Sequence, residues 1–381
     1  MPRPVVSEAV VAGGGIAGLA TALALRRAGV AAVVAEQAPA LREVGAGIGL
    51  WPNATRVLRH LGVLDAVAAS AGRVEAVTIQ NPAGRTLLRF RVRTTDAPAL
   101  CVHRADLLAA LRAALPGDAV RLGTRVGGYD ETAEGVRARF EDGTAATTPL
   151  LVGADGVRSA VRAALVGDGG PRFTGMTVWR GIGPRPAALA PGEAVEMWGD
   201  GLRFGTFDVG GGRTYWYAVR NRPEGEAQGA PDVQKAALLR LFARWHAPVC
   251  EAVAATPAGA ILRTDVYDRR PARGWTRGRV VLVGDAAHPA TPDLGQSGAL
   301  ALEDARGLAD CVGRSATLGE ALAAFERARY ARTALVTRQS RLAGRLGQAA
   351  GLAGRVRNAA AWASPSPVFG ALFSWPFRHA G

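Results

Sequence analysis

Cysteine is scarce in this chain of 381 residues, and the three that occur, Cys101, Cys250 and Cys311, lie far apart. Thiols so few and so scattered exclude a disulfide framework and a cysteine-based zinc site. The five histidines also lack the spacing of metal ligands. The sequence therefore predicts no metal site.

Long hydrophobic runs are missing as well. No apolar stretch reaches the roughly 18 residues that span a bilayer. The N-terminal segment leads from a short apolar run straight into a glycine turn, unlike a signal peptide. We therefore expect a cytoplasmic protein with no membrane span, and a chain of this length with 49% hydrophobic residues suits about two domains.

Lysine is almost absent. The 46 Lys and Arg residues include one lysine, Lys235, so 45 are arginines, and the net charge is +14. These arginines are dispersed and form no basic stripe within a known nucleic-acid-binding module, so we expect no nucleic-acid partner. The positive charge favours an anionic substrate or cofactor.

Glycine is abundant, and its first cluster forms a motif. The spacing Gly13-x-Gly15-x-x-Gly18 comes directly after a short apolar strand and directly before a predicted helix. Glycines at these positions allow a tight turn, a close backbone approach to a pyrophosphate and close packing of the helix on the sheet. The motif predicts a nucleotide-binding βαβ unit, in which Ala17 lies on the first turn of the helix.

An acidic residue follows the motif at the expected distance. The predicted helix ends near residue 28 with Gly29 as its C-terminal cap, and a second strand over 31–35 ends at Glu36. A carboxylate at this position can bind ribose hydroxyls, which favours FAD or NAD over the 2′-phosphate of NADP. Gln37 lies beside it at the same strand end.

A second informative stretch is RVVLVGDAAHPATPDLGQSGALALEDA, residues 279–305. A buried strand over 280–283 ends at Gly284-Asp285, a loop rich in Pro and Gly follows, and a helix is predicted from about Gly298. Free N–H groups at the start of a helix stabilise negative charge. Together, the two motifs indicate a site for a large, phosphate-bearing cofactor.

These motifs resemble those of the single-component FAD-dependent aromatic monooxygenases, the p-hydroxybenzoate hydroxylase-like family. Within this family, the chain is most similar to the members that include urate hydroxylase and the salicylate hydroxylase-like and zeaxanthin epoxidase-like proteins. It covers about residues 8–335 and also rests on EVGAGIGLWPNA at 43–54, VHRADLLAAL at 102–111 and LLVGADGVRSAVR at 150–162. The implied fold is α/β, a Rossmann-like FAD-binding domain with an inserted α+β substrate domain on an antiparallel sheet.

The resemblance implies a role for individual residues. Glu36 would hold the adenosine ribose, and Asp285 would bind the ribityl chain. Asp155 would organise the pyrophosphate region. The remaining cofactor contacts would come from Arg42, Arg104, the backbone of Val126, Pro292, Gly295, Gln296, Ser297 and Gly298.

The middle of the chain has a different pattern. Between residues 172 and 270, alternating apolar and polar residues with glycine turns predict an antiparallel sheet, interrupted by a helix at about 232–247. A strand pair is expected at 73–80 and 86–91. We assign 1–71, 100–171 and 271–342 to the FAD-binding domain, 72–99 and 172–270 to the substrate domain, and 343–381 to a C-terminal helix and Pro-rich tail.

Substrate contacts are predicted at three residues. Arg203 and Tyr215 lie twelve residues apart across the GGG turn, and Asp293 lies in the loop before the last motif helix. In urate hydroxylase-like members, an arginine, a tyrosine and an acid at matching positions act on the substrate. The alternative is a solvated strand residue, a core tyrosine and a turn former. Alternation along the strand places Tyr215 and Tyr217 on one face and Trp216 on the other.

The implied activity is hydroxylation of an aromatic or purine-like substrate by a flavin hydroperoxide formed from O2, with NADH or NADPH as transient co-substrate. The substrate is expected to be a small molecule, planar and anionic or phenolic, and the enzyme a monomer or homodimer. Alternatives are a flavin-dependent epoxidase, a natural-product tailoring oxidase, a reductase without oxygen insertion and a non-catalytic flavin-binding protein. This scaffold hosts many substrates, so the fold alone identifies none of them.

Overall fold

The computed structural model describes residues 4–41, 46–92 and 96–364. Its first layer is a six-stranded sheet. In spatial order the strands are β18 (Thr276–Arg277), β19 (Val280–Leu282), β12 (Leu151–Gly153), β1 (Glu8–Ala12), β2 (Ala31–Ala35) and β8 (Val120–Arg121). All neighbours run parallel except β18, which pairs antiparallel with β19.

The first βαβ unit forms as the sequence predicts. Helix α1 (Ile16–Arg27) follows β1 and returns the chain to β2. It is apolar and buried on most sides because α8 (Ser297–Arg314) packs against it. Gly29, which has a φ of +89°, allows the chain to leave the helix in a left-handed conformation.

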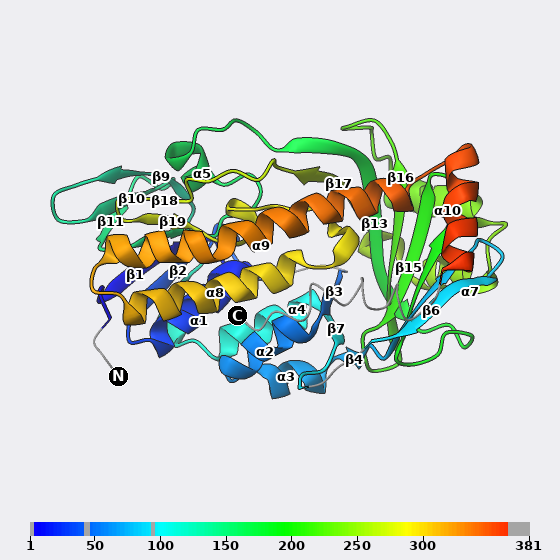
Figure 1. The fold of residues 1–381 in the computed structure, drawn as a ribbon, viewed down its shortest axis with the longest axis horizontal. Helices are drawn as coiled ribbons and strands as arrows, with labels where there is room; N and C mark the ends of the chain where they lie inside the picture. Colours follow the sequence, from blue (N-terminus) through cyan, green and yellow to red (C-terminus); the bar gives the residue numbers. More distant parts are fainter. Residues whose placement is uncertain (1–3, 42–45, 93–95, 365–381) are drawn as a thin grey trace.

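Further helices pack around this sheet (Figure 1). They are α2 (Pro52–His60), α3 (Leu64–Ala69), α4 (Arg104–Ala113), α5 (Ala160–Leu165) and α9 (Leu318–Gly347). Two three-stranded antiparallel sheets complete this part of the molecule. One has the order β11 (Ala145–Thr148), β10 (Val136–Phe140), β9 (Val126–Glu131), and the other β3 (Gly47–Leu50), β7 (Leu100–His103), β4 (Gly72–Arg73).

A seven-stranded sheet forms the other end of the molecule, on the right in Figure 1. Its order is β17 (Leu262–Asp268), β13 (Arg172–Pro184), β16 (Arg213–Asn221), β15 (Leu202–Asp208), β14 (Glu193–Trp198), β5 (Ala76–Gln80) and β6 (Thr86–Arg91). All pairs are antiparallel except β14 with β5. The strand pair expected before residue 99 therefore extends the sheet expected in the middle of the chain.

The single helix expected at about 232–247 is wrong in detail. The structure has two helices there, α6 (Pro231–Phe242) and α7 (Ala247–Ala255). The chain turns between them, where the Trp245 N–H donates to the Phe242 carbonyl. Pro248 lacks an N–H, so it suits the first turn of α7, where it lies, and would not suit the interior of one continuous helix.

The two faces of the seven-stranded sheet differ as the alternation predicts. Trp216 is fully buried on the outer face with Phe204 and Phe242, under α6 and α7. Tyr215 and Tyr217 lie on the opposite face, with their ring centroids 6.1 Å apart. Trp216 of β16 thus packs under the helices on one face of the sheet, whereas Tyr215 and Tyr217 lie on the other face.

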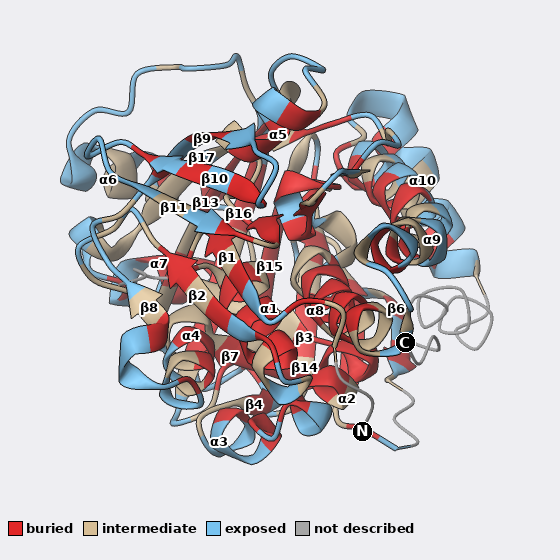
Figure 2. Cartoon of the chain, turned by 90° about the vertical axis from the view of Figure 1, so that its left-hand side faces the viewer, coloured by how far each residue is buried: buried red, intermediate tan, exposed pale blue. Residues whose placement is uncertain are grey.

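Two C-terminal helices connect the ends of the molecule. Helix α9 extends from beside the six-stranded sheet to the seven-stranded sheet and continues past the expected boundary at residue 342 (Figure 1). Helix α10 (Gly351–Ala363) then packs beside β6. Both helices lie on one side of the molecule and have exposed residues facing outward (Figure 2).

Candidate active site

The glycine turn between β1 and α1 leaves no room for side chains at two of its three motif positions. A Cβ atom on Gly18 would lie 1.8 Å from the Gly13 carbonyl oxygen, and one on Gly13 would lie 2.6 Å from the Ala154 carbonyl oxygen. Gly13 also has a φ of +102°. Gly15 differs because a Cβ there would meet nothing within 4 Å. The turn is tightly packed on its protein side and open at Gly15.

Glu36 lies against this turn. Its Oε2 accepts a hydrogen bond from the Gly14 N–H at 2.5 Å, and its Oε1 accepts one from the Ala38 N–H at 2.8 Å. Two backbone donors therefore hold the half-buried carboxylate at the end of β2, beside the start of α1. This is the arrangement that a ribose-binding acid requires.

Asp155 lies on the other side of the glycine turn. Its carboxylate accepts hydrogen bonds from the Ser159 hydroxyl at 2.5 Å and the Ala160 N–H at 2.7 Å, which caps α5. Burial raises the pKa of Asp155, although these hydrogen bonds oppose the shift. The carboxylate thus has a local structural role as well as a position beside the turn.

The second motif meets the first at Gly284. A Cβ atom on Gly284 would lie 2.7 Å from the Cβ of Ala17 on α1. The next residue, Asp285, is exposed to solvent, yet desolvation by the surrounding protein raises the pKa of its carboxyl group, and the charges of His288 and Arg104 oppose that rise. Asp285 is therefore an accessible carboxylate whose charge interacts with those of His288 and Arg104.

A buried ionic network fixes the backbone around Asp285. Asp304 on α8 accepts hydrogen bonds from the Gly284 N–H at 2.9 Å and from Nε of Arg329 at 2.7 Å, and its carboxylate lies 2.5 Å from Nε2 of His288. Arg329 also donates to the neighbouring Glu303 at 2.6 Å. The network therefore connects α9, α8 and both sides of Asp285.

The network predicts a loss of stability in acid. Burial raises the pKa of Asp304, but His288 and Arg329 outweigh that effect and lower the pKa from 3.8 to about 2. A depressed pKa stabilises the fold above the pKa of the unfolded state, and this contribution is lost as the pH falls through the folded-state pKa. We expect the free energy of unfolding to fall between about pH 4 and pH 2, and to fall less in Asp304→Asn. Chemical denaturation at several pH values measures the free energy of unfolding of both proteins. The same dependence on pH in the two proteins would contradict the conclusion that Asp304 causes the loss of stability in acid.

The start of α8 is built for close approach. Gln296 at its N-cap is buried, and its Oε1 accepts a hydrogen bond from the Asn53 amide at 3.0 Å. Gly298 packs so tightly that a Cβ would lie 2.7 Å from Ile48 of β3. Among the described residues, no side chain caps α8 and no acid lies in its first turn. The same holds for α1.

These features fit FAD. Two uncapped helix N-termini offer N–H groups and positive dipole ends, one beside Glu36 and the other on the loop that carries Pro292 and Gly295. The loop and the first turn of α8 are accessible at Pro292, Gly295, Ser297 and Gly298, which are all at least partly exposed. Asp285 directly follows Gly284, the residue that contacts α1.

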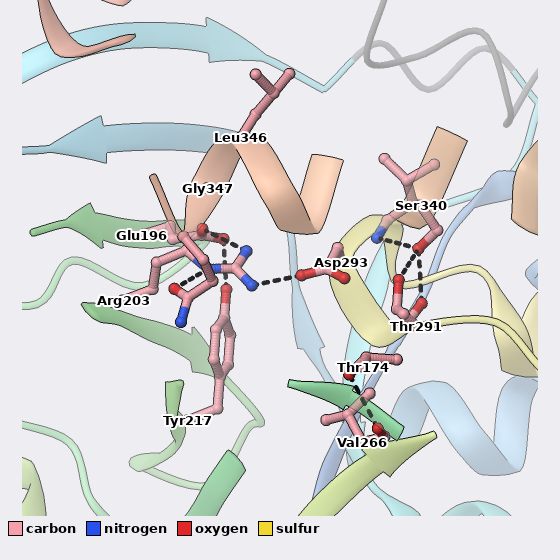
Figure 3. Close-up of polar contacts among 12 residues, drawn as sticks. Thr174, Glu196, Arg203, Tyr217, Val266, Thr291, Asp293, Ser340, Leu346 and Gly347 are labelled. Carbon is pink, nitrogen blue, oxygen red and sulfur yellow. Dashed lines mark hydrogen bonds and ion pairs between the residues drawn. The ribbon is translucent and has the colours of Figure 1, made fainter. Parts of the chain in front are cut away.

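Arg203 and Asp293 form an ion pair, although they lie 90 residues apart in sequence (Figure 3). Arg203 on β15 also donates to Glu196 at 3.3 Å and to Gln348 at 3.0 Å. Burial of the guanidinium lowers its pKa, but Glu196 and Asp293 outweigh this and hold the pKa of Arg203 above its ordinary value. The alternative of a solvated strand arginine does not hold, because Arg203 is only 4% exposed.

Tyr217, and not Tyr215, belongs to this cluster. The Tyr217 hydroxyl donates to Glu196 Oε2 at 2.5 Å, and burial together with that carboxylate raises the phenol pKa well above its ordinary value. The Tyr215 ring lies against β3, where a Cβ on Gly47 would be 2.4 Å from the ring. Tyr215 therefore packs beside β3, and its hydroxyl is not among the groups bound to Arg203.

The remaining predicted residues are dispersed. Arg42 lies outside the described residues. Gln37 is exposed, and Val126 is buried at the start of β9. Among the described residues, no group of three or more His, Cys, Asp or Glu side chains could hold a metal ion, and no described helix is both long and apolar enough to cross a membrane.

Sequence reasoning missed several residues of these networks. Glu196, Gln348 and the Asp304–Arg329 pair come from different elements, and no local pattern marks them. Tyr217 could have been found, because alternation along β16 places it on the same face as Tyr215. The Gln348 contact comes from the region where the family resemblance is weakest.

The fold and the glycine turn define a dinucleotide-binding α/β flavoprotein with a second, mainly antiparallel sheet. The chain belongs to the FAD binding domain family, whose model matches residues 7–340. It is 42% identical to the aurachin C monooxygenase/isomerase of Stigmatella aurantiaca over 343 residues, which cover 89% of each chain. It is 34% identical to the FAD-dependent urate hydroxylase of Klebsiella pneumoniae over 326 residues, which cover 84% of this chain and 85% of the relative.

A solved structure supports the same family assignment. The structure of Klebsiella pneumoniae HpxO complexed with FAD and uric acid superposes with a TM-score of 0.91 at 30% identity, and covers 97% of this chain and 96% of that one. The expected family, fold class, FAD cofactor and monooxygenase activity are thereby confirmed. The chain is an FAD-dependent monooxygenase.

Proposed function

We propose that this enzyme hydroxylates a planar, anionic or phenolic substrate of the aromatic or purine class, with O2 and with NADH or NADPH as transient reductant. The ion pair between Arg203 and Asp293 carries the proposal, because it joins the seven-stranded sheet to the loop before α8. Relatives named for urate and for 3-amino-4-hydroxybenzoate support this substrate class. FAD supplies the oxygen chemistry when bound, and the chain supplies orientation and exclusion of water.

Two charged side chains, Asp293 and Arg203, are suited to bind the substrate. Oδ2 of Asp293 is buried and has no hydrogen-bond partner within the described part of the chain, and such an acceptor suits an N–H or O–H of a substrate. The Arg203 guanidinium would attract a negatively charged or carbonyl group. Tyr215 would contact the substrate from β16, beside β3. Glu196 would act indirectly, because it holds Arg203 and Tyr217 in place.

The division of the chain follows from the two large sheets. We propose that 1–71, 100–171 and 271–342 bind FAD, and that 72–99 and 172–270 bind the substrate. The strands of the six-stranded sheet come from the first set, and those of the seven-stranded sheet from the second. Three free cysteines are consistent with a reducing cytoplasm, where both nicotinamide cofactors are present. A monomer or homodimer is proposed.

The direct test of function is substrate-stimulated oxidation. The purified enzyme should show a flavin spectrum, and one of a panel of aromatic acids, phenols and urate should stimulate NADH or NADPH oxidation. Mass spectrometry should then find one atom from labelled O2 in the product. Stimulated oxidation without labelled product, across every stimulating compound, would contradict hydroxylation and favour a reductase.

The substrate residues have their own test. We expect Arg203→Ala and Asp293→Ala to retain FAD and to lose about 10- to 100-fold in stimulated oxidation, because each removes a charge-assisted hydrogen bond of about 1.5–3 kcal/mol. Flavin content by absorbance and kcat/KM for the best substrate measure the two effects. Arg203→Lys is the conservative comparison.

The two tyrosines separate direct from indirect contacts. Tyr215→Phe should raise KM if its hydroxyl binds the substrate, whereas Tyr217→Phe should act through Glu196 and Arg203. If both alanine variants, Arg203→Ala and Asp293→Ala, retained full coupled turnover, neither residue would be needed to bind the substrate, and the assignment would be wrong.

A further inference from the structure

The C-terminal helices have an exposed surface that the active site does not use. We call it the apolar–basic face. It comprises the exposed residues Leu335, Arg338, Leu342, Arg345 and Leu346 of α9 and Leu352, Arg355, Val356 and Trp362 of α10.

Large apolar side chains are concentrated on this face. Of the eight exposed large hydrophobic residues in the described part of the chain, six lie on α9 and α10. Leu352 is 76% exposed and Trp362 62% exposed. The spacing places Leu335, Leu342 and Leu346 along one side of α9, and Leu352 and Val356 along one side of α10, because residues four, seven and eleven apart share a helical face. Apolar groups clustered in this way mark an interaction surface.

The charge of this segment is of one sign. After Glu326 the sequence contains nine arginines and no Asp or Glu. Several of these arginines serve the fold, such as Arg329 with Asp304 and Arg341 with Asp268. Arg338, Arg345 and Arg355 are exposed and form no hydrogen bond or ion pair with other residues that the structure describes.

Two charged groups from neighbouring elements, Asp200 and Arg85, lie beside the face. Asp200 accepts a hydrogen bond from the Gly351 N–H at 2.6 Å and so caps α10. The cation of Arg85 on the loop before β6 lies 5.7 Å from the ring of Trp362, which adds positive charge at the far end of α10. The face therefore combines exposed apolar and basic side chains on both helices, with one acid beside it.

We propose that the apolar–basic face binds the surface of an anionic lipid bilayer. Leucine, valine and tryptophan side chains would enter the boundary between headgroups and acyl chains, and the arginines would contact lipid phosphates. A second copy of the chain would bring arginines against arginines. A nucleic acid would leave the leucines exposed to water. No described helix could cross the membrane, so the contact would be peripheral.

The end of the chain is the competing occupant. The sequence beyond residue 364 contains Phe369, Phe373, Trp375 and Phe377, which could cover an apolar surface instead of lipid. The test must therefore separate this segment from the face itself.

The experiment is vesicle flotation of the full-length holoenzyme. It compares vesicles of phosphatidylcholine alone with vesicles that also contain phosphatidylglycerol. We expect binding to the anionic vesicles, with an affinity that falls as salt is added. Arg338→Gln, Arg345→Gln and Arg355→Gln should each weaken binding about fivefold, and the triple variant on the order of 100-fold.

The apolar contribution is tested with Leu342→Ser, Leu346→Ser and Leu352→Ser combined, which should also abolish flotation. The matched control combines Leu122→Ser and Val233→Ser, two exposed apolar residues outside α9 and α10, and should bind as the parent does. Flavin content and light scattering confirm that each variant is folded and report its oligomeric state.

A chain ending at Ser364 decides between the occupants. It should bind anionic vesicles at least as well as the full chain. Three results would overturn the proposal: no flotation of either the full or the shortened chain, binding lost on shortening but retained in the leucine and arginine variants, or a dimer that the leucine variant dissociates.

Discussion

Gly18→Ala should unfold more easily than the parent protein and should bind FAD at least about 100-fold more weakly. A Cβ there would lie 1.8 Å from the Gly13 carbonyl oxygen, so the backbone of the turn must move. Overpacking of this kind destabilises a fold by about 3 kcal/mol. Loss of the backbone donors at the turn would remove about two charge-assisted hydrogen bonds to the cofactor. Denaturation of the apoprotein and FAD titration by fluorescence measure the two effects.

Gly15→Ala is the matched control within the same turn. Its Cβ would meet nothing within 4 Å, and the φ of −73° suits alanine. The apoprotein should lose less than about 1 kcal/mol, which is the range for a changed helix N-cap. FAD affinity should nevertheless fall about tenfold, because the added methyl group occupies the side from which a pyrophosphate would approach. Unchanged FAD affinity in both variants would place the cofactor elsewhere.

Asp304→Asn should be the most damaging single change in the buried ionic network. The substitution removes one of the two carboxylates that compensate Arg329, and it weakens the hold on Gly284 and His288. Loss of one partner of a buried ion pair costs about 3–5 kcal/mol. We also expect weaker FAD binding, because Asp285 lies between the two anchored residues. Thermal and denaturant unfolding of the apoprotein and FAD titration measure the outcome.

The control for this prediction lies on the same helix. Asp310 pairs with Arg306 one turn away, and its side chain is 36% exposed. Asp310→Asn should therefore change stability by about 0.5 kcal/mol or less, as is usual for exposed ion pairs. Similar losses in the two variants would mean that α8 as a whole, and not the Asp304 network, is sensitive to charge.

Local structure was predictable where its cause is local. The βαβ unit from β1 to β2 lies within thirty residues, and its glycines, helix cap and terminal acid occur at characteristic spacings. Alternation along β16 likewise predicted the opposite directions of Tyr215 and Trp216. The helix at 232–247 failed for a local reason too, because Pro248 marks a new helix start that the apolar pattern alone does not show.

Contacts between distant elements were not predictable in the same way. Arg203 and Asp293 were both candidates from the family resemblance, but their ion pair depends on how β15, η4 (Pro292–Leu294) and α9 come together. Room for the pair exists because Gly344 and Gly347 of α9 have no side chains there: a Cβ on Gly344 would lie within 3 Å of Asp293, and one on Gly347 would lie 2.9 Å from Arg203. Nothing in the local sequence marks those two glycines.

The residues of single segments were enough to predict a nucleotide-binding site, the first βαβ unit and the antiparallel character of the middle region. Each of these follows from residue spacing along a single segment, which backbone geometry translates directly into shape. Three features depend on how distant segments pack: Tyr217 rather than Tyr215 joins the Arg203 cluster, Asp304 anchors both sides of Asp285, and α9 and α10 expose apolar and basic side chains. Those outcomes depend on which surfaces of distant segments are buried against each other, and sequence spacing does not encode that choice.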